Sequence, residues 1–192
     1  MGMEFTESFL SFVQAFYERR RGIELTDVFT ANRIGIFAET NESRPVSVGG
    51  EAVTGDFFNF ARQAVGKQRQ LSLFSTFRPR SNLSVEFVGS YAQSLDPQDE
   101  VDGRFLVSSL RTTYLFTRDS FLRVFAQTER QRTYFGEKQT NRGHLFSALF
   151  GWEYNPKSHL FVAYNEDWAT SEGKLRLGDR VVVFKISYLS NL

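Results

Sequence analysis

The segment HLFSALFGWEY, residues 144–154, lies within the stretch Arg104–Leu192 that decides the fold. Its even-numbered positions hold His, Phe, Ala, Phe, Trp and Tyr, whereas its odd-numbered positions hold Leu, Ser, Leu, Gly and Glu. Side chains that alternate between two faces over about ten residues are typical of strands that cross a membrane in a β-barrel. Four neighbouring segments read as strands of similar length: Arg104–Thr117, Phe121–Gln131, His159–Trp168 and Arg180–Leu189.

The first half of the chain predicts five more strands, which bring the total to about ten. They are expected at Phe5–Tyr17, Val28–Ala38, Val46–Phe60, Leu71–Phe77 and Leu83–Ala92. The first of these alternates only loosely, so a helix is an open alternative there. The sequence thus predicts one all-β domain over residues 1–192, an antiparallel up-and-down transmembrane β-barrel. Ten strands could close alone or form the C-terminal part of a larger barrel.

The predicted connections alternate in length along the chain. Short turns are expected near 41–45, 78–82, 117–120 and 155–158, and long loops near 18–27, 62–70, 93–103, 132–143 and 169–179. Short turns on one rim and long loops on the other are typical of bacterial outer-membrane barrels. This topology predicts that both termini lie on the short-turn, periplasmic side.

Composition agrees with a barrel in the bacterial outer membrane. The chain has 192 residues, a net charge of +1, no cysteine and 21 phenylalanines, with a mean hydropathy of −0.32. So many aromatic residues at that hydropathy suit a sheet with one face toward lipid and one polar face. No run of eighteen apolar residues exists, which excludes a membrane-spanning helix. Evenly distributed, balanced charges disfavour nucleic acid as a partner.

Aromatic residues gather toward both ends of the predicted strands. Phe77, Phe116, Trp152, Tyr154 and Tyr188 fall near short turns or the C-terminal end, and Tyr17, Phe57, Phe58, Tyr91 and Trp168 fall near long loops. Two such bands predict the interfacial aromatic girdles of a membrane barrel. The alternative is a soluble β-sandwich, whose core strands show the same alternation.

The closing part of the chain also resembles a known family. The residues that carry the resemblance are Trp152–Tyr154, Pro156, Ser158, Leu160, Phe161, Tyr164–Glu166, Arg180 and Val183–Leu189, with weaker similarity at Leu71–Leu73, Arg80–Leu83, Tyr91, Tyr114–Phe116, Arg123 and Gln127. The family is the uncharacterised bacterial outer-membrane β-barrel domain that usually follows a module similar to family 9 carbohydrate-binding modules. The resemblance implies a barrel fold and gives almost no information about activity.

The sequence predicts no catalytic residue, no cofactor and no metal site. Outer-membrane proteases of this size need an acid close to a histidine to activate water, and neither His144 nor His159 has an acid two residues before it. The two histidines open consecutive strands of one hairpin, so they are expected on the order of 30 Å apart. We therefore expect a protein that is not an enzyme, with an outer-membrane hydrolase as the weakest hypothesis.

Two groups of residues are candidates for binding, and a third group is predicted to line the lumen. Glu166, Asp167 and Trp168, expected where a strand meets a long loop, could bind a glycan or a partner protein. Arg19, Arg20 and Arg21 in the first long loop could bind lipopolysaccharide phosphates through bidentate hydrogen bonds. The predicted lumen residues are Arg111, Arg123, Gln127 and Glu153.

The leading hypothesis is therefore an outer-membrane β-barrel with a structural, anchoring or small-solute transport role, in contact with membrane lipid and lipopolysaccharide. The alternative is a surface module whose long loops bind a glycan or a protein.

Overall fold

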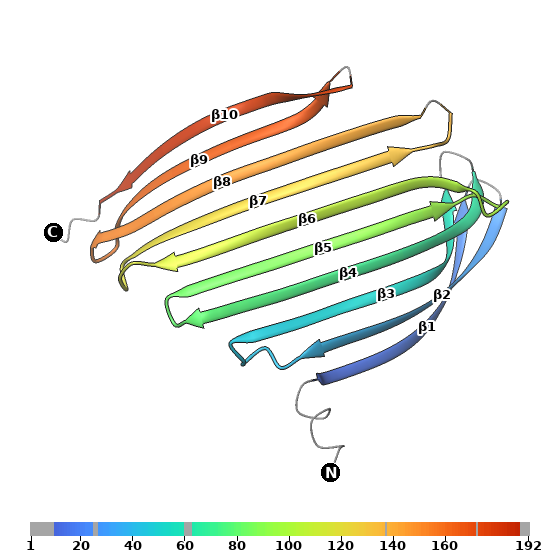
Figure 1. The fold of residues 1–192 in the computed structure, drawn as a ribbon, viewed down its shortest axis with the longest axis horizontal. Helices are drawn as coiled ribbons and strands as arrows, with labels where there is room; N and C mark the ends of the chain where they lie inside the picture. The colour runs from blue at the N-terminus through green and yellow to red at the C-terminus, as the bar shows by residue number, and fades with distance from the viewer. Residues whose placement is uncertain (1–9, 25–26, 60–62, 137, 172, 189–192) are drawn as a thin grey trace, which may run out of the picture.

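The computed structural model describes residues 10–24, 27–59, 63–136, 138–171 and 173–188. They form one antiparallel sheet of ten strands in sequential order (Figure 1). The strands are β1 (Leu10–Glu24), β2 (Asp27–Thr40), β3 (Val46–Asn59), β4 (Ala64–Arg80), β5 (Leu83–Leu95), β6 (Val101–Leu115), β7 (Ser120–Thr133), β8 (Gln139–Asn155), β9 (Ser158–Ser171) and β10 (Lys174–Ser187). The predicted all-β, up-and-down antiparallel fold is confirmed.

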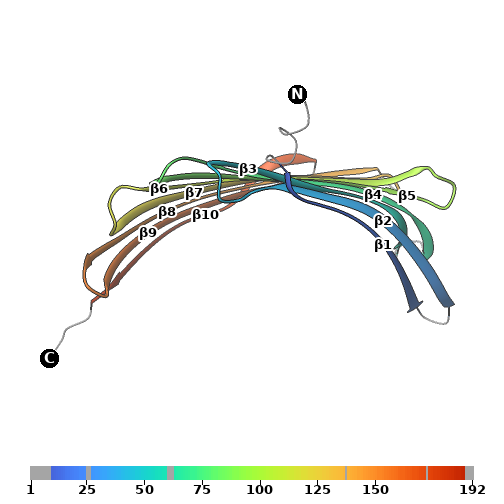
Figure 2. The same ribbon diagram turned by 90° about the horizontal axis from the view of Figure 1, so that it is seen from below.

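The sheet is a single curved layer, and no second layer covers either face within the described ranges (Figure 2). Only two apolar side chains there, Ala31 and Leu95, are less than 9% exposed. The alternative prediction of a soluble β-sandwich is therefore wrong, since a sandwich buries one face of each sheet against the other. Among the described residues no helix is long and apolar enough to span a bilayer.

The sheet is open in this structure. Within the part of the chain that the structure describes, β1 pairs only with β2 and β10 pairs only with β9. Among these residues the edge strands β1 and β10 do not pair with each other, so closure into a barrel stays a prediction. The helical alternative for Phe5–Tyr17 is wrong from Leu10 onward, since Leu10–Glu24 is strand; Phe5 to Phe9 lie outside the described residues.

Except for β3, which has 14 residues, the strands are longer than the sequence predicts, and all ten have 13 to 17 residues. Most of the residues assigned to long loops extend strands instead: residues 18–24 belong to β1, 64–70 to β4, 139–143 to β8 and 174–179 to β10. The predicted alternation of short and long connections is therefore wrong. The polar runs continue the sheet beyond the alternating segments.

Cross-strand register assigns each side chain to one of two faces, because directly paired residues point to the same side. We call one the apolar face; it carries Val13, Ile34, Ile36, Val48, Ala52, Leu71, Leu73, Val85, Phe87, Leu106, Leu110, Leu122, Val124, Phe146, Phe150, Val162 and Phe184. We call the other the mixed face; it carries Gln14, Phe37, Glu51, Gln70, Ser72, Phe74, Glu86, Ser90, Ser109, Arg111, Arg123, Phe125, Gln127, Ser147, Asn165 and Lys185.

Phenylalanine rings on the mixed face lie over glycines of neighbouring strands. A Cβ atom added at Gly35 would overlap the ring of Phe16, and one added at Gly49 would overlap the ring of Phe74. The ring of Phe37 lies between two others, with centroids 6.0 Å from Phe12 and 6.1 Å from Phe74. The glycines thus make room for aromatic side chains that lie along the mixed face.

Gly66 on β4 allows the closest approach of backbone, because a Cβ atom there would overlap the carbonyl of Leu95. We predict that Gly66→Ala lowers the free energy of unfolding by about 1–3 kcal/mol, the usual cost of overpacking. Gly103→Ala is the matched control on the same face, since its nearest contact is the hydroxyl of Ser94 at 3.0 Å, which can rotate away. Its effect should stay within about 0.5 kcal/mol. Urea unfolding followed by circular dichroism measures both, and equal effects would contradict the packing argument.

Candidate functional site

The largest feature of the surface is a continuous apolar region on the apolar face. Within the described ranges no charged residue interrupts it from β1 to β10. It runs from Leu106 on β6 to Phe116, the residue after that strand, and on β8 from Phe146 to Tyr154. These lengths match the roughly 9–11 residues that a tilted strand needs to cross the apolar part of a bilayer. We call this region the apolar band.

The side chains of the apolar band are exposed to an unusual degree. Ile34 is 58% exposed, Leu73 48% and Phe184 70%. Soluble monomers rarely expose a contiguous apolar patch of more than a few hundred Å², and larger patches mark contact with lipid or protein. The apolar band is therefore the main candidate for a functional surface.

A row of polar residues bounds the apolar band on every strand at the end nearer the predicted long loops. It consists of Arg19, Asn32, Asp56, Arg69, Gln93, Arg104, Arg130, Arg142, Glu166 and Arg180. We call this row the polar border. Its members contact one another in places: the backbone N–H of Asn32 donates to Asp56 Oδ2 at 2.9 Å. The band therefore has a defined edge.

Aromatic residues lie at the opposite edge of the band, close to the turns. The rings of Tyr114 and Phe116 are 4.9 Å apart, and those of Trp152 and Tyr154 are 6.0 Å apart. The Tyr154 hydroxyl donates to the carbonyl of Ser187 at 3.0 Å. Rings with a polar group at one end favour the boundary between an apolar phase and water.

The aromatic residues predicted near the other end are divided between the two faces. Tyr17 and Tyr91 lie on the apolar face within the band, one position from the polar border, and Phe58 lies on the same face beyond Asp56. Phe57 points to the mixed face, because consecutive residues of a strand alternate. The Tyr17 hydroxyl donates to Asn32 Oδ1 at 2.8 Å, which ties a ring to the border.

Glu166 is the centre of a hydrogen-bond network at the polar border. Its carboxylate accepts hydrogen bonds from the Tyr164 hydroxyl, from Trp168 Nε1 at 2.6 Å and from Arg180 Nε at 2.9 Å. A second guanidinium nitrogen of Arg180 also lies 2.9 Å from Glu166 Oε2. The carboxylate thus joins β9 to β10 and fixes the indole ring of Trp168.

Glu166, Asp167 and Trp168 are predicted at the end of a strand, where it meets a long loop. All three lie inside β9, which continues to Ser171. Glu166 and Trp168 point to the apolar face, whereas Asp167 points to the mixed face and accepts the backbone N–H of Asp179 at 2.9 Å. The three residues therefore do not converge. Since the indole N–H already donates to Glu166, the pair is ordered without a ligand.

The arginines predicted in the first long loop also lie in a strand. Arg19 is on β1 opposite Asn32, at the polar border, and Arg20 and Arg21 follow it on the same strand. The side chains of Arg20 and Arg21 lie outside the described residues. The predicted loop 18–27 is strand up to Glu24 because residues 18–24 pair continuously with β2.

The four residues predicted for the lumen, Arg111, Arg123, Gln127 and Glu153, all lie on the mixed face. Arg111 forms an ion pair with Glu86 at 3.4 Å and lies 5.7 Å over the ring of Phe125. Arg123 lies 5.7 Å over the ring of Phe121. Arg111 therefore lies between an acid and an aromatic ring, and Arg123 lies over a ring.

No catalytic or metal-binding arrangement is found in the described part of the chain. His144 pairs with Trp168 and His159 pairs with Glu153, so the histidines lie far apart along β8 and β9 and on opposite faces. Within the described ranges no three residues among His, Cys, Asp and Glu lie close enough to hold a metal ion.

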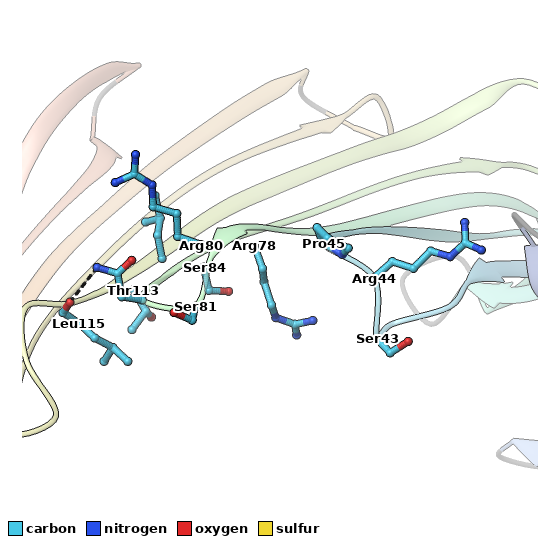
Figure 3. Close-up of a pocket in the computed structure, with 11 residues that line it drawn as sticks. Ser43, Arg44, Pro45, Arg78, Arg80, Ser81, Ser84, Thr113 and Leu115 are labelled. Carbon is cyan, nitrogen blue, oxygen red and sulfur yellow. Dashed lines mark hydrogen bonds between the residues drawn. The ribbon is translucent and has the colours of Figure 1, made fainter.

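A shallow pocket of about 340 Å³ lies between the turn after β2 and the turn after β4. Arg44, Arg78 and Arg80 line it, but Figure 3 shows that their guanidinium groups point in different directions. Arg78 is held in place because Nη1 donates to the carbonyl of Glu42 at 2.9 Å. These cations therefore do not form a common anion site.

Comparisons of the chain with protein-family models, with curated proteins and with solved structures return no match. The site therefore has to be interpreted from its own geometry.

Sequence reasoning missed the polar border. Its signal was present, because Arg69, Arg104 and Arg130 are each the charged residue next to an alternating apolar run. Arg69 falls in a predicted loop, whereas Arg104 and Arg130 fall in predicted strands, and only the register shows that they belong to one row on one face.

The network around Glu166 predicts a fluorescence effect. In a Trp152→Phe background Trp168 is the only tryptophan, because the chain has two. We expect Glu166→Ala to raise acrylamide quenching of Trp168, since the indole loses its hydrogen-bond acceptor and gains freedom to move. Asp167→Ala is the matched control, because its side chain points to the other face. Unchanged quenching in Glu166→Ala would contradict the ordering role of this carboxylate.

Proposed function

We propose that the protein is a bacterial outer-membrane β-barrel protein with a structural or anchoring role. The observation that carries the proposal is the apolar band with its polar border on one side and its aromatic residues on the other. Such a face suits contact with acyl chains between two interfaces. The mixed face would then line the interior.

The hydrogen bonding of the backbone supports the same proposal. A strand in a bilayer must satisfy its N–H and C=O groups on neighbouring strands, because the hydrocarbon region offers no water. Consecutive strands here pair from β1 to β10 with few register shifts. The two free edges need partners, which either β1 and β10 themselves or further strands of a larger barrel would supply. The resemblance to the outer-membrane family in the closing block favours the same membrane.

The composition of the mixed face favours a filled interior over an open channel. Phe12, Phe37 and Phe74 cluster on it, and Arg111 is paired with Glu86. A barrel of about eight strands has an interior that side chains just fill, and ten strands add little width. A structural or anchoring role is therefore favoured over small-solute transport.

Charge substitution on the two faces tests contact with lipid. Leu110 on the apolar face is 45% exposed and Val88 on the mixed face is 48% exposed. They lie at the same level, since Leu110 pairs with Phe87 and Val88 with Ser109. We predict that Leu110→Arg lowers the free energy of unfolding in lipid vesicles by about 2–4 kcal/mol, as for a cation facing the middle of a bilayer.

Val88→Arg is the matched control, and its cost should stay below about 1 kcal/mol because the mixed face would not meet lipid. Urea unfolding in vesicles, followed by heat-modifiable migration on gels, measures both variants. If the two substitutions cost the same, or if the chain stays monomeric and folded in plain buffer, the proposal is wrong.

Planar-bilayer recording separates the structural role from transport. We expect currents at background level from the chain closed by its own ten strands, because rings and paired charges occupy the mixed face. The variant Phe74→Ala removes one ring from the cluster. If that ring blocks the interior, this variant should conduct more than the unaltered protein. Steady, large currents from the unaltered protein would instead favour small-solute transport.

A further inference from the structure

We propose that the apolar face carries a binding site for a phosphate-bearing lipid, built by Arg104, Arg130, Arg132 and Arg142. The proposal rests on the membrane location proposed above and adds a ligand class and a place. The four guanidinium groups come from three adjacent strands, β6, β7 and β8, at and just beyond the polar border. We call them the arginine cluster.

Register sets these arginines directly opposite one another. Arg104 pairs with Arg132 across β6 and β7, and Arg130 pairs with Arg142 across β7 and β8. Directly opposed residues have Cβ atoms about 4.5–5.5 Å apart, and like charges in such pairs destabilise a sheet. Two such pairs side by side create a strongly positive surface that an anion would stabilise.

The described neighbours of the cluster supply no carboxylate at the directly paired positions. On the apolar face Gln93 lies opposite Arg104, Leu106 opposite Arg130 and Thr140 opposite Arg132. Glu129 and Glu166 are the nearest acids on β7 and β9, but Glu129 points to the mixed face and Glu166 is bonded to Arg180. Asp102 lies two residues before Arg104 on β6 and accepts a hydrogen bond from the side-chain amide of Asn59, so no described carboxylate is directly paired with an arginine of the cluster.

The side chain of Arg130 gives an independent indication of a missing acceptor. Its Nε atom is buried and has no hydrogen-bond partner. A buried donor without a partner is costly, and an acceptor relieves that cost only if the Arg130 side chain turns outward to meet it. Arg104 is held from the other side, with its guanidinium 5.9 Å from the centre of the Tyr134 ring. Planar guanidinium groups bind phosphate oxygens bidentately, which fits this set of donors.

The surface next to the cluster selects a lipid over a soluble phosphate. Leu106, directly opposite Arg130, is 46% exposed, and Leu110 and Phe146 further along the same face are 45% and 40% exposed. A molecule with phosphate on the arginines would lay its acyl chains over these side chains. The combination of a cationic cluster and an adjoining apolar surface therefore fits an anionic amphiphile.

The test measures how lipids shift the thermal unfolding midpoint of the detergent-folded chain, which yields an apparent dissociation constant. The probes are phosphatidylglycerol, lipid A with two phosphates, zwitterionic phosphatidylcholine and inorganic phosphate. We expect the anionic lipids to bind more tightly than phosphatidylcholine and inorganic phosphate. The double variant Arg130→Gln/Arg132→Gln should weaken anionic-lipid binding by about tenfold or more, because it removes charge-assisted hydrogen bonds.

The control Arg111→Gln/Arg123→Gln changes the net charge equally on the mixed face and should leave lipid binding within about twofold of the parent. Arg130→Lys/Arg132→Lys keeps the charge and loses bidentate geometry, so it should give an intermediate weakening and serves if the glutamine variant does not fold. Equal binding of phosphatidylcholine, equal binding of inorganic phosphate, or equal loss in the control would each overturn the proposal.

The experiment also separates this proposal from the membrane location. A chain that folds in phosphatidylcholine micelles but does not distinguish anionic lipid keeps the membrane location and loses the lipid site. A chain that folds in no micelle and stays monomeric in buffer loses both.

Discussion

The structure depends on one constraint: a single sheet without a second layer has to satisfy its backbone inside the sheet and its apolar face outside the chain. The ladders from β1 to β10 meet the first requirement. The described chain does not cover its own apolar face, since Ala31 and Leu95 are its only buried apolar side chains. Burial of apolar area is the main favourable term in folding. The medium that covers the apolar band is therefore part of what stabilises the fold.

The extra length of the strands follows from the same constraint. The apolar band uses about nine to eleven residues of a strand, but β4 and β8 each have 17 residues. The remaining residues carry charges on both faces, as at Glu129, Arg130 and Arg132 on β7. They continue the ladder because pairing with the neighbouring strand satisfies the backbone in water as well as in lipid. The sheet thus extends past the polar border as strands with mostly polar side chains.

The sequence predicted the part of the fold where one face must be apolar. Alternation located β6 to β10. It also indicated that Arg111, Arg123, Gln127 and Glu153 share a face, because within each strand they alternate with the apolar positions. It failed beyond the border, where residues 18–24 and 174–179 are strand although residues 18–21 are all charged and residues 174–179 hold only two apolar side chains, Leu175 and Leu177. Alternation disappears there, and polar composition alone does not distinguish a solvated strand from a loop.

Prediction of the candidate site was limited by register. The opposition of Arg104 to Arg132 and of Arg130 to Arg142 depends on how β6, β7 and β8 align, which no local pattern in one strand contains. The grouping of Glu166 with Asp167 failed for a simpler reason, because adjacent residues of a strand point to opposite faces. Glu166 and Asp167 were grouped because they are adjacent in the sequence, whereas the structure pairs Glu166 with Arg180 on the next strand.

The two open edges of the sheet are subject to the same requirement for backbone hydrogen bonds. If the apolar band lies in a bilayer, the outer N–H and C=O groups of β1 and β10 would face hydrocarbon, which no membrane sheet tolerates. Ten strands in up-and-down order make β1 and β10 antiparallel, so these two edges can pair with each other without a change of topology. A longer barrel would need an even number of added strands to keep that relation. Figure 2 shows that one end of β1 and one end of β10 curve to the same side of the layer, which agrees with either way of closing it.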